Sequence, residues 1–379
     1  MKIAITADVH LREEYPERLG ALRNILEQVK ERGIQQLFIA GDLFDKDGDD
    51  SCQSIFARVC GDFPEVQIHV IPGNHDLSLS AKDFDVDNLK IYTQPQFIDL
   101  GQRELFLMVP YSNNVGMGEV LSSTVMKAGE RDWVLVGHGD YLTVNREPNP
   151  RERRIYMPLR RGDVQQFTPK YVVLGHIHKP TPLKARMDGK VIYVGSPQGL
   201  DITETGKRRF LIYDDEAKDS FEEQEIATDI IYFNESFFVV PSDDEVANLK
   251  MEIGDRINWG LEYEERQKVR MRAVIRGCTQ AGKPDIKKAV EDALKENGIE
   301  LHKEKAHKTN PDTESLIVSS ADPQRMELAL KTLVLIEELV SPEISDGEGE
   351  GKSAWDFGGK EPDLDAVKQE ALLAIYKSS

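Results

Sequence analysis

The chain has 379 residues, 40% of them hydrophobic, and a formal net charge of -19 at pH 7. That length allows more than one domain, and this apolar content is sufficient to fill complete cores. No apolar span of twenty residues is present and the first residues lack the long apolar region of a signal peptide, so we expect a cytoplasmic protein without membrane association. The acidic charge argues against a uniformly basic surface, so any nucleic-acid contact would need locally concentrated positive charge.

Five short apolar segments in the first half of the chain have the length and composition of buried strands. Each stops at a small residue and is followed by side chains of metal-binding type. The segments at residues 2–6, 35–40, 66–71, 132–137 and 171–175 precede, respectively, Asp8 and His10; Asp42; Asn74, His75 and Asp76; His138; and His176 and His178. Two close histidines at one strand end are a weak signal, but five such endings together predict a shared metal site.

A helix is expected between the first two strands, because apolar side chains in residues 15–33 recur at helical spacing before Gly33. Strand, helix, strand is the unit of a parallel or mixed α/β sheet. Such sheets bind ligands in the crevice beyond the carboxyl ends of their strands, so all five endings can meet in one place. Residues 190–199 and 207–216 predict two more strands, which would close the first domain near residue 225.

The loop after Asp42 is acidic, with four aspartates between residues 45 and 50, and a helix is expected at residues 52–60. Asp45 is interpreted as a carboxylate that hydrogen-bonds a metal ligand, as a helix cap or as part of a solvated turn. The three cysteines are odd in number and lie outside all five endings, so neither a disulfide framework nor a cysteine-built zinc site is indicated. They are Cys52, Cys60 and Cys278.

A basic segment at residues 146–162 lies between the fourth and fifth endings and contains Tyr156. Arginine binds phosphate through two hydrogen bonds and stacks on bases, so this segment is the predicted nucleic-acid contact. The alternative is a solvated loop whose charge is offset by Glu147 and Glu152. The arginines predicted to bind nucleic acid are Arg151, Arg153, Arg154, Arg160 and Arg161.

The pattern changes at residue 226. Residues 226–340 alternate strand-like and helical segments and predict a small α+β domain with its own core. His302 and His307 lie there among lysines and are interpreted as solvated residues, not as a second metal site. Residues 341–363 are rich in glycine and acids, which predicts a flexible linker. Residues 364–379 predict a short amphipathic helix that either packs on its own second domain or binds a partner protein.

The ordered set of strand endings resembles the signature of the calcineurin-like metallophosphoesterases. Within that superfamily, GDLFD at 41–45, GHIH at 175–178 and VGSPQG at 194–199 resemble the SbcD-type DNA repair exonucleases. The resemblance implies an α/β fold, a β-sheet sandwich flanked by helices in residues 1–225, followed by an α+β DNA-binding cap domain in residues 226–340 and a helical tail. The set comprises Asp8-x-His10, Gly41-Asp42, Gly73-Asn74-His75-Asp76, Gly137-His138 and Gly175-His176-x-His178.

The resemblance also implies two divalent metal ions, usually manganese in this family. Mixed imidazole and carboxylate ligands suit manganese, iron or zinc better than calcium. Two such cations about 4 Å apart can clamp the attacking and leaving oxygens of a displacement at phosphorus. His75 would stabilise the transition state or protonate the departing oxygen, and Asp76 would orient His75 or cap the following turn. Asp8, His10, Asp42 and His178 would hold one ion, and Asp42, Asn74, His138 and His176 the other.

The predicted function is a manganese-dependent DNA nuclease of double-strand-break repair, an exonuclease on duplex ends and an endonuclease on single strands or hairpins. The resemblance implies a homodimer and an SbcC-type coiled-coil ATPase partner, bound here through residues 364–379. Two alternatives stay open. A metallophosphoesterase acting on a small phosphodiester or a phosphoprotein would share every ligand, whereas a non-catalytic scaffold would bind no metal.

Overall fold

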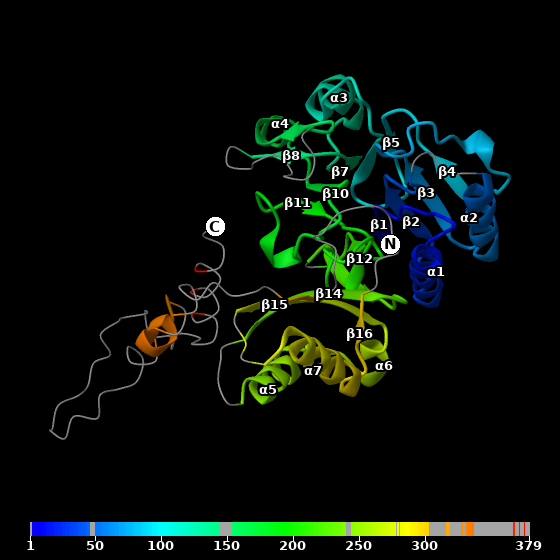
Figure 1. Ribbon diagram of the computed structural model, residues 1–379. Coiled ribbons are helices and arrows are strands. Elements are labelled where there is room, and N and C mark those ends of the chain that lie inside the picture. The colour runs from blue at the N-terminus through cyan, green and yellow to red at the C-terminus, as the bar shows by residue number, and fades with distance from the viewer. Residues whose placement is uncertain are drawn as a thin grey trace. The chain divides into compact units, whose positions relative to one another are not determined.

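The computed structural model divides into two compact units, Met1–Ile231 and Tyr232–Ser379 (Figure 1). It describes residues 2–45, 50–143, 154–217, 219–239, 244–277, 279, 281–302, 316–318, 327, 328, 331–336, 367, 371 and 375. Among these residues, no helix has both the length and the apolar character needed to cross a membrane.

The first sheet of the N-terminal unit has six strands, in the order β13-β12-β1-β2-β3-β4. The four strands from β1 to β4 are parallel, and β12 and β13 continue the sheet in antiparallel pairing. All the parallel strands therefore end at the same edge. The strands are β1 (Lys2–Thr6), β2 (Gln36–Ala40), β3 (Gln67–Ile71), β4 (Leu89–Ile91), β12 (Arg208–Asp214) and β13 (Phe221–Ile226).

The second sheet has five strands in the order β11-β10-β7-β6-β5. Four of them are parallel, and β5 pairs with β6 in antiparallel orientation. β7 and β10 pair without interruption along their length, and in this register His138 lies opposite Gly175. The strands are β5 (Gln96–Ile98), β6 (Leu105–Val109), β7 (Trp133–His138), β10 (Tyr171–Gly175) and β11 (Val191–Tyr193).

The two sheets pack face to face, because alternate residues of each strand point to opposite sides. In β2, Phe38 enters the core between the sheets, together with Phe106 and Val173 of the second sheet. Its neighbours Leu37 and Ile39 point outward to the helices α1 (Pro16–Glu31) and α2 (Asp50–Asp62). The helices α3 (Met117–Thr124) and α4 (Arg161–Phe167) cover the second sheet. This sandwich flanked by helices confirms the predicted fold.

Helix α1 matches the expectation from its sequence. Proline occupies its first turn, where no backbone N–H is needed, and its buried side chains form one stripe. It ends before Gly33, whose φ of 64° suits a residue without Cβ. The shorter elements of this unit are η1 (Ala81–Asp83), η2 (Val125–Ala128), η3 (Leu183–Ala185), β8 (Tyr141–Leu142) and β9 (Leu159–Arg160).

The C-terminal unit contains a four-stranded sheet in which β15 neighbours β14, β16 and β17. Val269, Met271, Ala273 and Ile275 of β15 alternate as buried residues. The predicted linker at 341–363 lies outside the described residues, as does the predicted terminal helix except for Val367, Ala371 and Ile375, which are helical. The elements are β14 (Ile231–Val239), α5 (Glu245–Arg256), α6 (Tyr263–Arg266), β15 (Val269–Gly277), α7 (Lys283–Glu296), β16 (Glu300–Leu301) and β17 (Leu316–Val318).

Candidate metal centre

The five predicted strand endings lie together where the two sheets meet. Strands β1, β2 and β3 deliver their polar residues from the first sheet, and β7 and β10 deliver theirs from the second. The imidazole Nδ1 of His138 donates to the carbonyl oxygen of Ala40 at 2.9 Å, so the two sheets touch at this edge. Gly41 makes the contact possible, because a Cβ at this residue would overlap the His138 ring.

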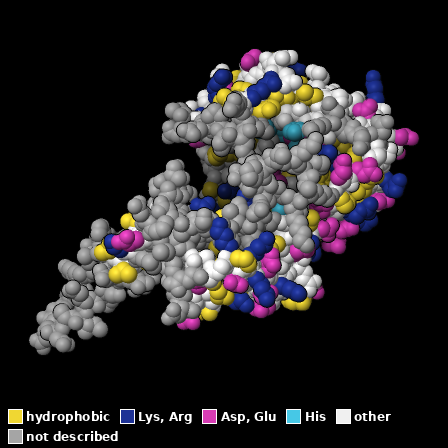
Figure 2. All heavy atoms as spheres, in the orientation of Figure 1, with side chains coloured by type: hydrophobic (Ala, Val, Ile, Leu, Met, Phe, Trp, Pro, Cys, Tyr) yellow, Lys and Arg dark blue, Asp and Glu magenta, His cyan; other side chains and the backbone are white. Residues whose placement is uncertain are grey.

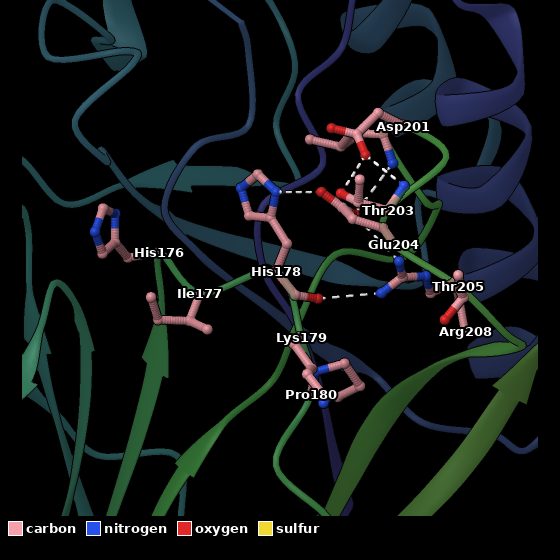
Figure 3. A pocket seen from close by; sticks show the side chains of 11 residues that line it. His176, Ile177, His178, Lys179, Pro180, Asp201, Thr203, Glu204, Thr205 and Arg208 are labelled. Carbon is pink, nitrogen blue, oxygen red and sulfur yellow. Dashed lines mark hydrogen bonds and ion pairs between the residues drawn. The ribbon is translucent and has the colours of Figure 1, made fainter. Parts of the chain in front are cut away.

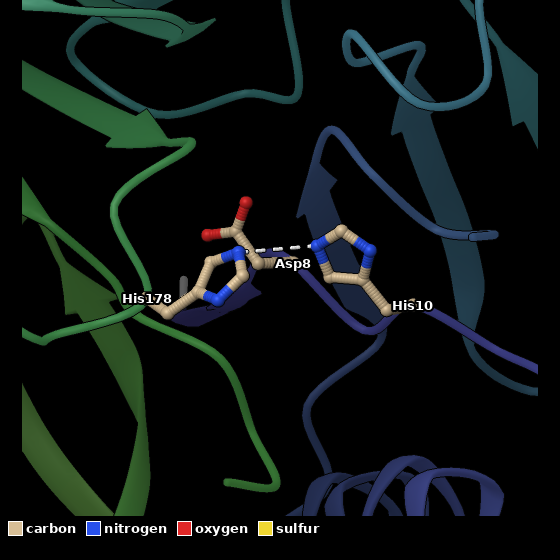
Figure 4. A group of neighbouring side chains, drawn as sticks. All are labelled: Asp8, His10 and His178. Atoms are coloured by element: carbon tan, nitrogen blue, oxygen red, sulfur yellow. Dashed lines mark hydrogen bonds between the residues drawn. The ribbon is translucent and has the colours of Figure 1, made fainter. Parts of the chain in front are cut away.

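One group of side chains comprises Asp8, His10 and His178, whose potential ligand atoms all lie within 4.8 Å of one another (Figure 4). The Nε2 atoms of His10 and His178 face each other at 3.1 Å. Asp8 Oδ1 accepts from the backbone N–H of His176 at 2.7 Å. Asp8 Oδ2 is buried and has no hydrogen-bond partner among the described residues. A buried oxygen of this kind fits a cation between these side chains.

A second group comprises Asp8, Asp42 and His138. Asp42 Oδ2 lies 3.2 Å from His138 Nε2 and 3.6 Å from His10 Nε2, so it faces both groups. Asn74 Oδ1 lies 3.0 Å from His138 Nε2 and 3.0 Å from His176 Nδ1. The structure thus brings together every side chain predicted to bind metal, with Asp42 between the two sets.

The backbone at this edge is strained. Asp8, His10 and Asp42 have φ values of 53°, 50° and 50°, and His176 has a φ of 91°. Residues with a Cβ rarely adopt this left-handed conformation, and such strain is concentrated at functional sites. The sharp turns aim these side chains from the strand ends into the shared space.

Burial and mutual charge set the protonation of the donors. Burial acts to raise the pKa of Asp42, but the charge of His138 and a hydrogen bond to it hold that pKa below its usual range. Burial lowers the pKa values of His10 and His176 to about 3, which leaves both imidazoles neutral. Burial raises the pKa of Asp8 to about 6. His10, His176 and Asp42 are therefore in the protonation states that bind divalent cations.

His75 lies at the rim of the centre and is 35% exposed. Its Nδ1 is 3.4 Å from Asp45 Oδ1, and its backbone N–H donates to Asp42 Oδ1 at 2.8 Å. The hydrogen bond with Asp45 raises the pKa of His75. Asp45 also pairs with Arg12 at 3.3 Å. Asp45 thus contacts His75 and Arg12, and none of the three interpretations of Asp45 included a contact with His75.

Asp76 has a different position from the one expected beside His75. Its Oδ1 accepts from the backbone N–H of Gly73 at 2.6 Å, and its Oδ2 accepts from those of Leu43 at 2.7 Å and Phe44 at 3.1 Å. The carboxylate is fully buried, and burial raises its pKa to about 6. Asp76 therefore ties the loop after β3 to the loop after β2, and the two roles predicted for it, orienting His75 or capping the following turn, stay predictions.

The predicted nucleic-acid arginines are only partly described, since Arg151 and Arg153 lie outside the described residues. Arg154 lies over the ring of Tyr156 at 5.8 Å, and that ring is 4.8 Å from the ring of His176. Arg160 and Arg161 are exposed, and Arg161 Nε pairs with Asp188 Oδ1 at 3.1 Å. On the face shown in Figure 2, basic and acidic side chains are mixed. The role of the arginines stays a prediction.

A cavity of about 510 Å³ borders the metal centre on the His178 side (Figure 3). Its wall includes His176, Lys179 and Glu204. Sequence reasoning missed Glu204, whose Oε1 lies 2.7 Å from His178 Nδ1. No strand ending or helical spacing marks this glutamate, so only the tertiary contact identifies it.

The N-terminal part of the chain is similar in sequence to a known protein family. Residues 1–180 match the family model described as calcineurin-like phosphoesterase. No curated protein matches the sequence. The protein TT1561 of Thermus thermophilus is similar in structure, with 12% identity over 59% of this chain and 98% of its own and a TM-score of 0.39. Purple acid phosphatase PPD1 from yellow lupin (Lupinus luteus) seeds has 14% identity over 59% of this chain and 51% of its own, with a TM-score of 0.38.

The nuclease MPE of Pseudomonas putida has 16% identity over 55% of this chain and 82% of its own, with a TM-score of 0.27. The family match rests on the sequence, and it covers all seven residues predicted to bind metal as well as His75. Residues 1–180, the part of the chain that holds these side chains, are therefore similar in sequence to the calcineurin-like phosphoesterase family.

Proposed function

We propose that this chain is a metal-dependent DNA nuclease of the SbcD type, which hydrolyses phosphodiesters at duplex ends and in single strands or hairpins during double-strand-break repair. The strongest support is the convergence of two donor groups on Asp42, beside a buried Asp8 oxygen that has no hydrogen-bond partner among the described residues. The segments at 41–45, 175–178 and 194–199 support the assignment to the SbcD branch.

Two divalent cations fit the donors, and we propose that they are manganese. When bound, they supply positive charge that stabilises the charge developing on the phosphoryl oxygens. Asp42 would contribute to both sites, because it lies between His10 and His138. The proposed ligands are Asp8, His10, Asp42 and His178 for one ion and Asp42, Asn74, His138 and His176 for the other.

His75 is the proposed proton donor to the departing oxygen. Its contact with Asp45 raises its pKa, which favours an imidazole that carries a proton near neutral pH. Asp45 occupies the Nδ1 side, so the Nε2–H is the group that would give up this proton. The backbone hydrogen bond from His75 to Asp42 holds its main chain beside a shared ligand.

We further propose that residues 226–340 contact DNA, that residues 364–379 bind a coiled-coil ATPase of the SbcC type, and that the active form is a homodimer. Deletion of residues 360–379 is expected to leave hydrolysis unchanged while weakening capture of the ATPase. A product that no longer folds would instead favour a terminal segment packed on its own chain.

One observation favours a smaller substrate. The cavity beside His178 has a volume of about 510 Å³, which lies in the range of sites that enclose small ligands. The alternative function is therefore hydrolysis of a small phosphodiester, which would use the same metal ligands.

The deciding experiment compares manganese-dependent digestion of end-labelled linear duplex and hairpin DNA with hydrolysis of bis-p-nitrophenyl phosphate. Wild type and Asp42→Asn are assayed together, with metal content measured for both. DNA digestion that requires manganese and Asp42 supports the nuclease. Turnover of the small diester alone supports the alternative, and a wild-type protein that binds no metal would contradict both.

A further inference from the structure

Glu204 contacts His178 on the side opposite the metal centre. Its Oε1 lies 2.7 Å from His178 Nδ1, while His178 Nε2 faces His10 at 3.1 Å (Figures 3 and 4). The Glu204 side chain is 14% exposed and belongs to the wall of the cavity. The imidazole is therefore held between a carboxylate and the group of predicted ligands.

Three donors fix the other oxygen of this carboxylate. Oε2 of Glu204 accepts from Ser196 Oγ at 2.9 Å, from the backbone N–H of Leu200 at 3.1 Å and from Arg208 Nη2 at 3.1 Å. Arg208 also donates through Nη1 to the carbonyl oxygen of His178 at 3.1 Å. One oxygen is thus occupied by donors, and the other remains for the imidazole.

The contact decides which imidazole nitrogen carries the proton. A carboxylate oxygen only accepts hydrogen bonds, so Nδ1 of His178 must donate to Glu204. In the neutral ring the lone pair then lies on Nε2, the atom that faces His10. A histidine held in this way presents Nε2 to a cation without having to rotate.

We propose that Glu204 is a positioning residue that fixes the tautomer and orientation of His178 for metal binding. This inference rests on the metal centre proposed above, and it adds the segment after Gly199 to the machinery of the site. Glu204 acts through His178 and touches neither substrate nor cation.

Glu204→Gln provides the sharpest variant, because its shape is conserved while its hydrogen-bonding pattern changes. The three donors around Oε2 require an acceptor, so the glutamine carbonyl oxygen turns toward them and its amide NH2 faces His178 Nδ1. That arrangement favours the tautomer with a proton on Nε2, which blocks ligation. Asp201→Asn is the matched control, because it removes the same charge from the same cavity wall and the Asp201 carboxylate accepts hydrogen bonds from Thr203.

The experiment measures manganese binding by titration calorimetry and unfolding temperature without metal for the full chain. In Glu204→Gln we expect affinity at one of two sites to fall about 10- to 100-fold, while Asp201→Asn binds like wild type. Spectra of ¹⁵N-histidine in the Zn²⁺-loaded protein, assigned with a His178→Gln variant, should show His178 ligated through Nε2 in wild type and not in Glu204→Gln.

Different outcomes overturn different claims. A wild-type protein that binds no manganese would overturn the proposed metal centre. A wild type that binds two ions, together with Glu204→Gln and Glu204→Ala variants that bind them equally well, would overturn only the role of Glu204. A Glu204→Gln variant that unfolds earlier without metal, yet keeps wild-type affinity and Nε2 ligation, would reduce Glu204 to a structural residue.

Discussion

Two histidines of the N-terminal unit are equally buried but lie in opposite electrostatic surroundings. His69 lies inside β3, 1% exposed, between Tyr92 and Gln36, and burial lowers its pKa to about 3. His138 ends β7 and is fully buried; burial acts in the same direction, but the charge of Asp42, a hydrogen bond to it and the charge of Asp8 together outweigh burial and raise the pKa to about 9. Burial therefore does not distinguish these two histidines, whereas a facing carboxylate does.

The hydrogen bonds of His69 explain why it needs no charge. Gln36 Oε1 accepts at 2.7 Å from Nε2–H, and the hydroxyl of Tyr92 donates to Nδ1 at 2.6 Å. Both ring nitrogens are thus satisfied in the neutral form. His138 has one nitrogen on a backbone carbonyl and the other among Asp42 and Asn74, where a cation can replace a proton.

Removing the carboxylate that distinguishes His138 should have the largest effect. We expect Asp42→Asn to lose both cations and to lower hydrolysis by about a thousand-fold or more, because Asp42 faces both donor groups. Metal analysis and initial rates check this. His69→Gln, the matched change at the other histidine, should keep both cations and the wild-type rate at a temperature where it is folded. Full metal content in Asp42→Asn would show that the carboxylate facing His138 is not needed for metal binding.

The next largest effect is expected at the rim, where His75 is only partly buried. His75→Ala should lower kcat by about 100- to 10,000-fold, the range for loss of a general acid, with metal content and unfolding temperature preserved. Asp45→Asn should cause a smaller loss and move the basic limb of the pH profile downward, because its contact raises the pKa of His75. Loss of bound metal from His75→Ala would show that His75 is a ligand.

The smallest expected effect concerns stability at His69. The pKa of His69 is about 3 in the folded protein and 6.5 in the unfolded chain. Below pH 6.5 the unfolded chain therefore binds a proton that the folded protein does not, so the free energy of unfolding falls as the pH is lowered from 6.5 toward 3. At pH 4.5 the linkage amounts to about 3 kcal/mol of unfolding free energy. Metal-free His69→Leu should therefore lose less stability than wild type between pH 7 and 4.5 in denaturant titrations. If the unfolding free energies of the two proteins fell equally with pH, the inference that His69 is neutral in the folded protein would be wrong.

The grouping of the proposed metal ligands was predictable because these residues directly follow strand ends. Asp8, Asp42 and His138 each come at the end of an apolar segment, and parallel strands deliver their carboxyl ends to one edge. The position of each residue at the end of an apolar segment was therefore enough to predict that these side chains lie close together. An α/β sheet was predictable from its continuous apolar strands: four consecutive residues of β2 are buried, so both faces of the sheet must be covered. The sandwich of two sheets was expected only from the family resemblance.

What the sequence could not indicate depends on contacts between segments that have no common pattern. Glu204 is 26 residues from His178 in a polar turn, where it resembles any surface acid. Asp76 follows His75 directly, which suggested that it orients His75 or caps the following turn, whereas the carboxylate 3.4 Å from His75 Nδ1 is Asp45, from another loop. Adjacency in sequence was a poor guide wherever the backbone turns sharply.

The left-handed backbone at Asp8, His10 and Asp42 has a practical consequence for engineering. Each of these residues costs about 1 kcal/mol relative to glycine in the same conformation. A library screened only for a higher melting temperature would therefore tend to enrich glycine at the positions that chemistry needs most. Heat resistance and catalysis would be selected in opposite directions at this edge of the sheet, so any such screen should also measure bound manganese.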